Sequence, residues 1–334
     1  MTIKDLAAQT GYSVGTVSRV LNNQSHVSEQ ARNAIQKAAK ESGFRLNTNA
    51  KQLKQQHGNS ILVICKGRSN ELYETLLTTI QSRISETDHP LIVDYVDESE
   101  NVVRRALNLC PEKKPLGILF LGGNREEFLE DFRNIKLPCV LVTGHGRDLP
   151  FENLSSVTAD DVQAGRIAIE HLIQLGHKKI VVVGGNRSYS DITRQRYQGC
   201  LDAFRKYCVE FTEAQDYETA RYVYEDAYQA TKRLLERKDD FTALFAMSDV
   251  MAIGATRALQ DSGKRVPEDV SVIGLDGLSV GAYMFPRLST IAQPADALAN
   301  RCVDLLLQSI EKKTGGIHEL VPVSLQKRES AVQI

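Results

Sequence analysis

The sequence predicts an α/β fold in which a three-helix head precedes two lobes, each built on a doubly wound parallel sheet. From residue 60 onward, short apolar runs such as ILVICK and LGILFLG alternate with helical segments, which is typical of parallel strands covered by helices on both faces. The runs form two successive sets, and this indicates two similar lobes with a cleft between them. Residues 1–46, in contrast, carry apolar residues only at helical spacing.

Length and composition limit the class of protein. A chain of 334 residues is too long for one ordinary core. No apolar run approaches the roughly 20 residues of a membrane span, and the N-terminus lacks the apolar segment of a signal peptide. The six cysteines form no C-x-x-C pair, so we expect buried thiols and a cytoplasmic location.

Charge is distributed unevenly along the chain. Residues 1–59 carry eight lysines and arginines against three acidic residues, whereas the remaining residues carry 33 against 39. A basic head on an acidic body favours a polyanion as the partner of the head. A solvated helical surface can show the same pattern, so the charge alone does not decide.

Three short helices are predicted in the head. Gly11 is expected to end the first helix, and Ser13 and Ser28 are expected to cap the second and the third. Each helix is too short to be stable alone, but together they can bury one small core. Two short helices joined by a glycine-containing turn describe a helix-turn-helix.

The outward face of the second helix carries mostly small or polar residues, namely Val14, Gly15, Thr16, Ser18, Arg19 and Asn22. Small side chains let a helix backbone approach base edges in a DNA major groove. There Arg19 can donate to guanine and Val14 can contact a thymine methyl group, while Ser13 and Thr16 can bind phosphate. A generic three-helix domain that binds protein is the alternative, and the pattern and charge favour DNA.

Long segments throughout the chain resemble one known family. The head contains TIKDLAAQTGYSVGTVSRVLNNQSHVS, followed by GFRLNTNAKQLK, and the body contains DDVQAGRIAIEHLIQLGHKKIVVVGG, SDVMAIGATRAL and VPEDVSVIGLDG. On these segments the chain is identified as a member of the lactose/galactose repressor (LacI/GalR) family of bacterial transcriptional regulators. GFRLNTNAKQLK is similar to the hinge helix of that family, and the body resembles its two-lobed periplasmic-binding-protein-like core.

The resemblance implies specific DNA contacts. Base-reading positions would be Val14, Gly15, Ser18 and Arg19, and backbone-contacting positions would be Ile3, Ser13, Thr16, Asn22 and His26. In the family two hinge helices meet in the minor groove, where Leu53 would wedge into a base step beside Lys54. Asn47 would cap the hinge helix, and Ala50 would face the second copy. Leu46 stands where family members often carry a proline, and a packed Leu53 in an ordinary linker is the alternative.

The same resemblance implies the division into domains. The helix-turn-helix domain would comprise residues 1–46, and the hinge helix with its linker residues 47–59. The chain would cross three times between the lobes, so that the first lobe comprises residues 60–159 with 293–320. The second lobe would comprise residues 160–292 with 321–334.

Polar side chains follow the predicted strands of both lobes, where ligands of such sheets bind. The resemblance implies effector contacts by Arg196, Ser248 and Asp276, and a guanidinium opposite a carboxylate can hold vicinal hydroxyls of a sugar. Further candidates for the wall of the site are Ser69, Tyr73, Thr143 and Tyr222, with Tyr217 or Tyr224 as alternatives to the last. Asp249 is instead expected to cap the helix that it begins.

Two positions depart from sugar-responsive family members, which often carry asparagine at the position of Ser248 and aspartate at that of Thr143. The predicted pocket therefore has fewer hydrogen-bonding groups. A sugar or sugar derivative is the expected effector, and nucleosides and phosphorylated compounds stay open.

One pentapeptide, GLSVG at residues 277–281, fits the G-x-S-x-G pattern of a hydrolase nucleophile and precedes Asp296 and His318. Its surroundings read as a loop, not as the tight strand-to-helix turn of that motif, so we expect no enzyme and no catalytic residue. The seven histidines are dispersed, so we expect neither a metal nor a cofactor.

We therefore expect a cytoplasmic repressor, nucleoid-associated when bound, that binds double-stranded operator DNA as a homodimer. A small effector between the lobes would change their angle and thereby form or melt the hinge helices. The dimer would use helices around residues 72–80 and 251–259, and KRESAVQI lacks the heptad extension on which tetramers of the family rely. The alternative is a solute-binding or sensor protein of the same core fold, which the basic helix-turn-helix disfavours.

Overall fold

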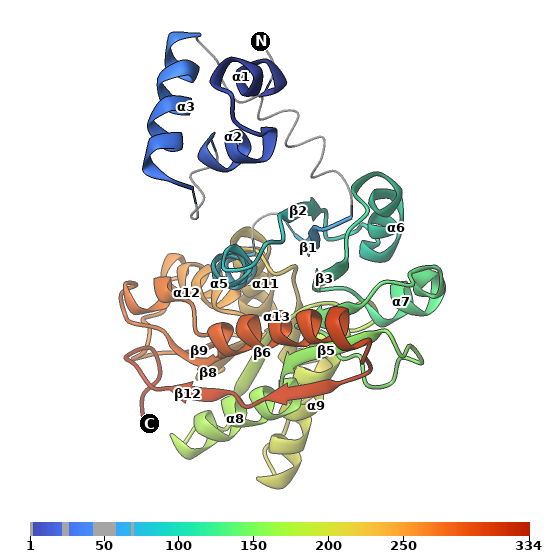
Figure 1. Cartoon of the computed structure of the whole chain (residues 1–334). Helices are drawn as coiled ribbons and strands as arrows, with labels where there is room; N and C mark the ends of the chain where they lie inside the picture. The colour runs from blue at the N-terminus through green and yellow to red at the C-terminus, as the bar shows by residue number, and fades with distance from the viewer. Residues whose placement is uncertain (1–2, 22–26, 43–57, 68–69) are drawn as a thin grey trace. The chain divides into compact units, whose positions relative to one another are not determined.

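The computed structural model describes residues 3–21, 27–42, 58–67 and 70–334 (Figure 1). The contacts divide the chain into two compact units, residues 1–57 and residues 58–334.

The first unit contains the three predicted helices, α1 (Ile3–Thr10), α2 (Val14–Leu21) and α3 (Glu29–Glu41). Both predicted caps are confirmed, because Ser13 Oγ accepts the amide N–H of Thr16 at 3.1 Å and Ser28 Oγ accepts that of Ala31 at 3.3 Å. Gly11 ends α1 with a positive φ of 72°, a conformation that glycine adopts without strain. The small core is formed by Leu6, Ala7, Val17, Val20, Ala31, Ile35, Ala38 and Ala39.

The first lobe of the second unit is a parallel sheet with the strand order β11-β5-β4-β3-β1-β2. Its strands are β1 (Ile61–Lys66), β2 (Leu91–Val96), β3 (Gly117–Leu121), β4 (Cys139–Val142), β5 (Leu154–Ala159) and β11 (His318–Val321). One face packs against α5 (Glu71–Ser85) and α13 (Ala295–Lys312), and the other packs against α6 (Val102–Lys113) and α7 (Arg125–Asp131), which η1 (Phe132–Asn134) extends.

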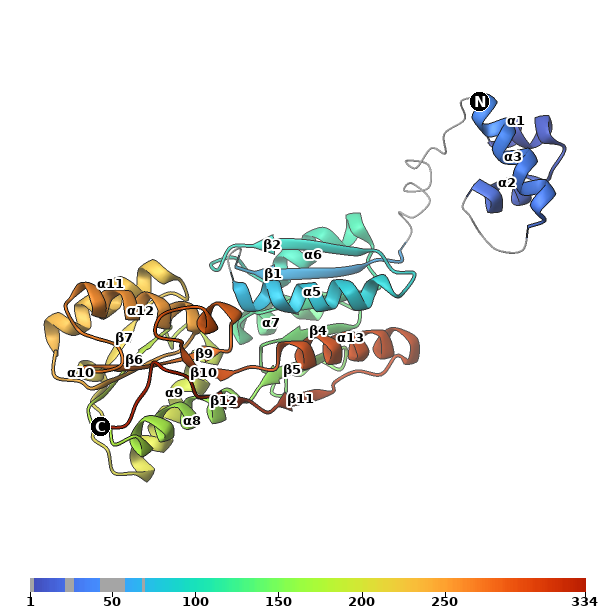
Figure 2. The same cartoon turned by 90° about the vertical axis from the view of Figure 1, so that its left-hand side faces the viewer.

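The second lobe has the strand order β12-β10-β9-β8-β6-β7. Figure 2 shows α8 (Asp161–Gln174) and α9 (Asp191–Lys206) on one side of this sheet and α11 (Tyr224–Arg237) and α12 (Asp249–Asp261) on the other. The strands are β6 (Ile180–Gly184), β7 (Tyr217–Thr219), β8 (Ala243–Ala246), β9 (Ser271–Asp276), β10 (Ser289–Ala292) and β12 (Ser324–Gln326), and the short helices are α10 (Glu213–Asp216) and η2 (Ser279–Ala282).

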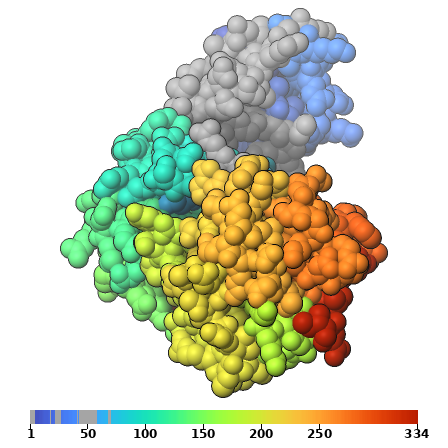
Figure 3. Space-filling view, turned by 180° about the vertical axis from the view of Figure 1, so that it is seen from behind, coloured from blue at the N-terminus to red at the C-terminus, as the bar shows by residue number. Residues whose placement is uncertain are grey.

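The predicted α/β fold with two parallel-sheet lobes is confirmed, with one exception at an edge. Strand β12 runs antiparallel to β10, because the chain enters it from the neighbouring lobe and not through a crossover helix. The chain passes between the lobes after β5, after β10 and between β11 and β12. Figure 3 shows the first lobe (cyan to green) adjoining the second (yellow to orange) along one face.

Among the helices of the described residues, none combines the length and the apolar character that a membrane span requires.

Candidate functional site

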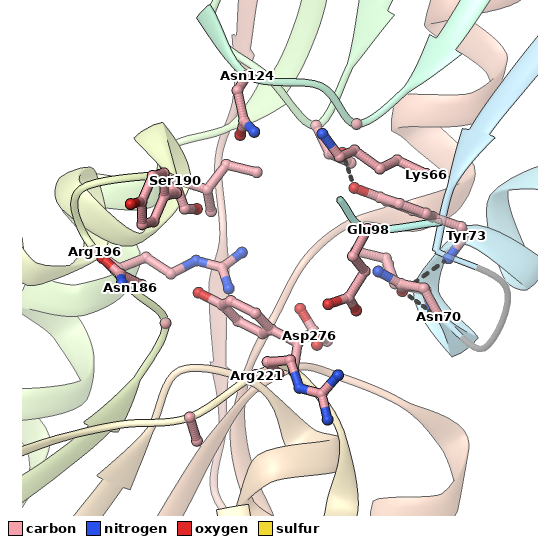
Figure 4. A pocket seen from close by; sticks show the side chains of 18 of the residues that line it. Lys66, Asn70, Tyr73, Glu98, Asn124, Asn186, Ser190, Arg196, Arg221 and Asp276 are labelled. Atoms are coloured by element: carbon pink, nitrogen blue, oxygen red, sulfur yellow. Dashed lines mark hydrogen bonds between the residues drawn. The ribbon is translucent and has the colours of Figure 1, made fainter. Parts of the chain in front are cut away.

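A cavity of about 510 Å³ lies between the two lobes (Figure 4). The carboxyl ends of strands from both sheets meet there, as expected for parallel α/β sheets. Five of the seven predicted effector contacts line it, namely Tyr73, Thr143, Arg196, Tyr222 and Asp276. Ser69 lies outside the described residues, and Ser248 is not part of the lining.

Arg196 is the central cation of the cavity. It lies in α9 and is only 5% exposed. Its Nε donates to Asp161 Oδ1 at 2.8 Å and its Nη1 donates to the carbonyl oxygen of Met247 at 2.6 Å. Burial opposes the charge, but the neighbouring Asp161, Tyr222 and Asp276 outweigh it and raise the pKa of the guanidinium. Figure 4 shows the remaining edge of the guanidinium facing the cavity, where it can donate to a ligand.

Asp276 is the matching anion and ends β9. Its Oδ1 accepts the side-chain N–H of Gln293 at 2.7 Å. Burial raises the pKa of this carboxyl to about 7, against the opposing charge of Arg196, and the buried Asp249 raises it further. The carboxyl therefore exchanges its proton near neutral pH.

Two residues of the cavity have strained backbones. Thr143, directly after β4, has a φ of 57°, and Asp276 has a φ of 131°. Non-glycine residues rarely adopt such values, and where they persist they often mark functional sites. Thr143 Oγ1 donates to the hydroxyl of Tyr73 at 3.0 Å, so that both side chains are held in the wall.

The structure distinguishes the three tyrosine candidates. Tyr222 lines the cavity, and its hydroxyl bonds with Thr193 Oγ1 at 2.8 Å. Tyr217 donates to the carbonyl oxygen of Gly185 within the core of the second lobe. Tyr224 extends across to the first lobe, where it donates to Glu71.

Ser248 differs from its predicted role. It is 3% exposed, and its Oγ accepts the amide N–H of Met251 at 3.1 Å, which makes it the N-cap of α12. The prediction that Asp249 caps α12 is wrong, because Ser248 occupies the N-cap position and Asp249 is the first residue of the helix. The Asp249 carboxylate instead accepts the amide N–H of Leu278 at 2.7 Å and the hydroxyl of Thr290 at 2.6 Å, and it thereby ties α12 to β9 and β10.

Several residues of the site were not predicted from the sequence. Lys66 and Arg221 line the cavity and pair with Glu127 and Asp226 respectively, as Arg196 pairs with Asp161. Further polar groups of the lining are Asn70, Glu98, Asn124, Asn186, Ser190 and Gln293. Position at or just after the end of a strand was a usable signal for Lys66, Asn124 and Asn186. No local pattern points to Asp161, which belongs to the first turn of α8.

In the head, the outward face of α2 is as predicted where the structure describes it. Val14 is 42% exposed, and Gly15 and Arg19 are also exposed. Ser13 Oγ bonds with Thr16 Oγ1 at 2.9 Å. The side chains of Ile3 and Ser18 are not described, and Asn22, His26, Asn47, Ala50, Leu53 and Lys54 lie outside the described residues.

The sequence matches known proteins over its full length. Residues 2–47 match the bacterial regulatory proteins of the lacI family, and residues 169–331 match the periplasmic binding protein-like domain. The HTH-type transcriptional regulator MalR of Clostridium butyricum is 32% identical over 340 residues, which cover all of both chains. The chain belongs to the LacI family.

Solved structures agree with this assignment. This LacI-family regulator aligns over 99% of both chains with a lac repressor dimer bound to operator and the anti-inducer ONPF, at 26% identity and a TM-score of 0.82. A complex of the transcriptional regulator CelR with cellobiose aligns over 99% of both chains at 27% identity and a TM-score of 0.74. The chain is a DNA-binding transcriptional regulator and not an enzyme. Its GLSVG segment at residues 277–281 overlaps η2 and does not form a strand-to-helix turn.

Proposed function

We propose that this regulator is a cytoplasmic repressor that binds operator DNA as a homodimer and responds to a sugar-like effector between its lobes. The observation that carries the proposal is the buried Arg196 in one cavity with Asp276, both fixed by neighbouring side chains. A guanidinium edge and a carboxylate can donate to and accept from the hydroxyls of one sugar ring. The cellobiose complex of CelR and the operator-bound lac repressor dimer support the same view.

The charges of the described lining favour an uncharged effector. Each of its cations, Lys66, Arg196 and Arg221, has its own carboxylate partner. Glu98 adds negative charge without an ion pair of its own among the described residues, and Asp276 adds more when it is ionised. A phosphate would therefore enter a site with little free positive charge, so we expect neutral sugars to bind more tightly than their phosphates.

The cavity also has room for more than one ring. Its volume of about 510 Å³ lies within the usual range of small-molecule sites. Tyr189 at its edge is 73% exposed and offers an aromatic face on which a second ring can stack. Cellobiose and maltose are thus the first compounds to test.

The function is tested with the intact chain. Genomic fragments are first selected for binding to the protein at low salt. The affinity for the selected duplex is then measured at two salt concentrations. The measurement is repeated with each compound of a panel, namely glucose, ribose, cellobiose, maltose and glucose 6-phosphate. We expect a steep loss of affinity with salt, because many phosphate contacts form. We also expect one neutral sugar to raise the melting temperature and to change the affinity for DNA. A chain that binds a sugar but no duplex would favour a solute-binding protein instead.

Arg19 provides a prediction for the head. Its replacement by alanine is expected to weaken binding to the selected duplex by about 5- to 150-fold, corresponding to about 1–3 kcal/mol for a base-reading arginine. The matched control is Lys40→Ala, which removes a positive charge from the exposed side of α3. Fluorescence anisotropy titrations measure both variants. Equal losses in the two would indicate general electrostatic attraction and contradict a base-reading role of Arg19.

The remaining DNA contacts keep the assignment that the family resemblance implies. We propose that Ser18 reads bases with Val14 and Gly15, and that the hinge residues act on the minor groove as wedge, cap and reader. The proposed contacts to the DNA backbone come from Ile3, Ser13, Thr16, Asn22 and His26. In the hinge, Leu53 would be the wedge, Asn47 the cap and Lys54 the reader, and Ala50 would face the second copy.

Asp276 provides a prediction of pH dependence. Its ionised carboxylate accepts sugar hydroxyls with both oxygens, and the protonated form loses part of that capacity. Because its pKa is about 7, sugar affinity is expected to rise from pH 6 to pH 8, by up to about tenfold if only the ionised form binds. Isothermal titration calorimetry at pH 6, 7 and 8 measures this change. Asp276→Asn should bind more weakly and show no such rise, and a flat profile of the wild-type protein would contradict the assignment.

A further inference from the structure

Asp161 bonds at the same time with the arginine of the cavity and with a histidine of the other lobe. It is the first residue of α8, where the chain enters the second lobe after β5. Its Oδ1 accepts from Arg196 Nε at 2.8 Å, and its Oδ2 bonds with Nε2 of His145 at 3.1 Å. His145 follows β4 of the first lobe. The three side chains therefore connect the cavity with the first lobe through one carboxylate.

The chemistry of these contacts fixes the direction of each bond. An ionised carboxylate can only accept, so His145 must carry a proton on Nε2 and donate it. Asp161 is 2% exposed and the His145 side chain is 19% exposed, so water competes weakly for these bonds. Both oxygens are engaged, and a movement of one partner therefore changes the contact with the other.

His145 also lines a second, smaller cavity of about 170 Å³. Residues of the first lobe form most of its wall, and Gln195 of α9 contributes from the second lobe. Gln195 is adjacent to Arg196 in sequence. His145 thus bonds with a residue of the second lobe and borders a cavity that residues of both lobes line.

We propose that His145 is a positioning residue that transmits effector binding at Arg196 to the first lobe through Asp161. This inference rests on the proposed control by a ligand between the lobes. A ligand that accepts a hydrogen bond from the free edge of the Arg196 guanidinium shifts Asp161. The bond between Asp161 and His145 then favours one angle between the lobes over another. By linkage, the lobe angle selected by DNA acts back on Arg196 through the same contacts.

The test compares variants by the ratio of duplex affinities without and with a saturating sugar, using the sugar of the panel that raises the melting temperature most. His145→Ala, which has no donor, is expected to reduce this ratio at least about fivefold, a typical size for one allosteric coupling. Its affinity for DNA without sugar should change less. His145→Gln, whose amide can donate to Asp161, is expected to restore most of the ratio. Melting curves establish that both variants fold.

The matched control is Arg105→Ala, which removes an ion pair with Asp94 from the first lobe outside both cavities. It should leave the ratio unchanged. A wild-type protein that responds to the sugar together with an unchanged ratio in His145→Ala would overturn the inference alone. Equal loss in His145→Ala and His145→Gln would also overturn it, since a donor to Asp161 would then be irrelevant. A wild-type protein without any response would overturn the proposed function and this inference with it.

Discussion

Replacement of Arg196 by methionine is expected to abolish the response to sugar and to destabilise the fold. Arg196 would no longer donate into the cavity, so binding that depends on the guanidinium is lost. The carboxylate of Asp161 would also stay buried, with His145 as its remaining hydrogen-bond partner among the described side chains. Removing one member of a buried ion pair typically costs about 3–5 kcal/mol, because the other charge is left uncompensated. Urea unfolding followed by circular dichroism measures the free energy of unfolding, and calorimetry measures sugar binding.

The two effects of this variant can be separated. Adding Asp161→Asn to Arg196→Met removes the uncompensated charge, so the double variant should regain much of the stability but none of the sugar binding. Arg265→Met is the matched control, since it breaks an exposed ion pair with Asp269 in the same lobe and should change stability little. A single variant that still responds to sugar with wild-type affinity would show that Arg196 is not the central contact.

The sequence predicts the fold well because local patterns determine most of it. Strands covered on both faces appear as uninterrupted apolar runs, and the buried ILVICK segment forms β1 as such a run. Helix starts in the head were equally readable, since a serine cap acts on an amide only three residues away. The antiparallel β12 was not readable, because its direction depends on which lobe the chain leaves and not on its own residues.

The site was predicted less completely because its contacts span long distances in the sequence. Residues 160 and 161 form one acidic pair in the sequence, yet Asp160 caps α8 and only Asp161 reaches Arg196, 35 residues later. No periodicity separates these two roles. Likewise, the sequence pattern could not distinguish Tyr222 from Tyr217, because the two tyrosines lie in the same short segment. Only the packing of the second lobe places Tyr217 in the core and Tyr222 at the cavity.

Helices α8 and α9 cross closely at two glycines. Gly165 in α8 and Gly199 in α9 face the backbone of the opposite helix. A Cβ on Gly165 would lie 2.0 Å from the carbonyl oxygen of Arg196, and a Cβ on Gly199 would lie 2.0 Å from that of Val162. A backbone atom cannot rotate away as a side chain can, so Gly165→Ala must move the two helices apart.

The size and sign of that effect follow from two opposed terms. Alanine favours a helix over glycine by about 1 kcal/mol, whereas overpacking a core costs about 1–3 kcal/mol and more when backbone must move. We expect the clash to dominate and Gly165→Ala to lose about 3 kcal/mol in urea unfolding. Gly15→Ala in α2 is the control, because its Cβ would meet nothing closer than 3.8 Å, and the stability of the head should be unchanged or higher.

The same variant should also affect the site. Asp161 begins α8 and Arg196 lies in α9, so a wider crossing lengthens or breaks the bond between them and misplaces the guanidinium. Sugar affinity of Gly165→Ala, measured by calorimetry at a temperature where the variant stays folded, is therefore expected to fall together with its stability. A folded variant with wild-type stability would mean that the helices can separate at no cost. A destabilised variant with wild-type sugar affinity would mean that the crossing supports the fold alone and does not position Arg196.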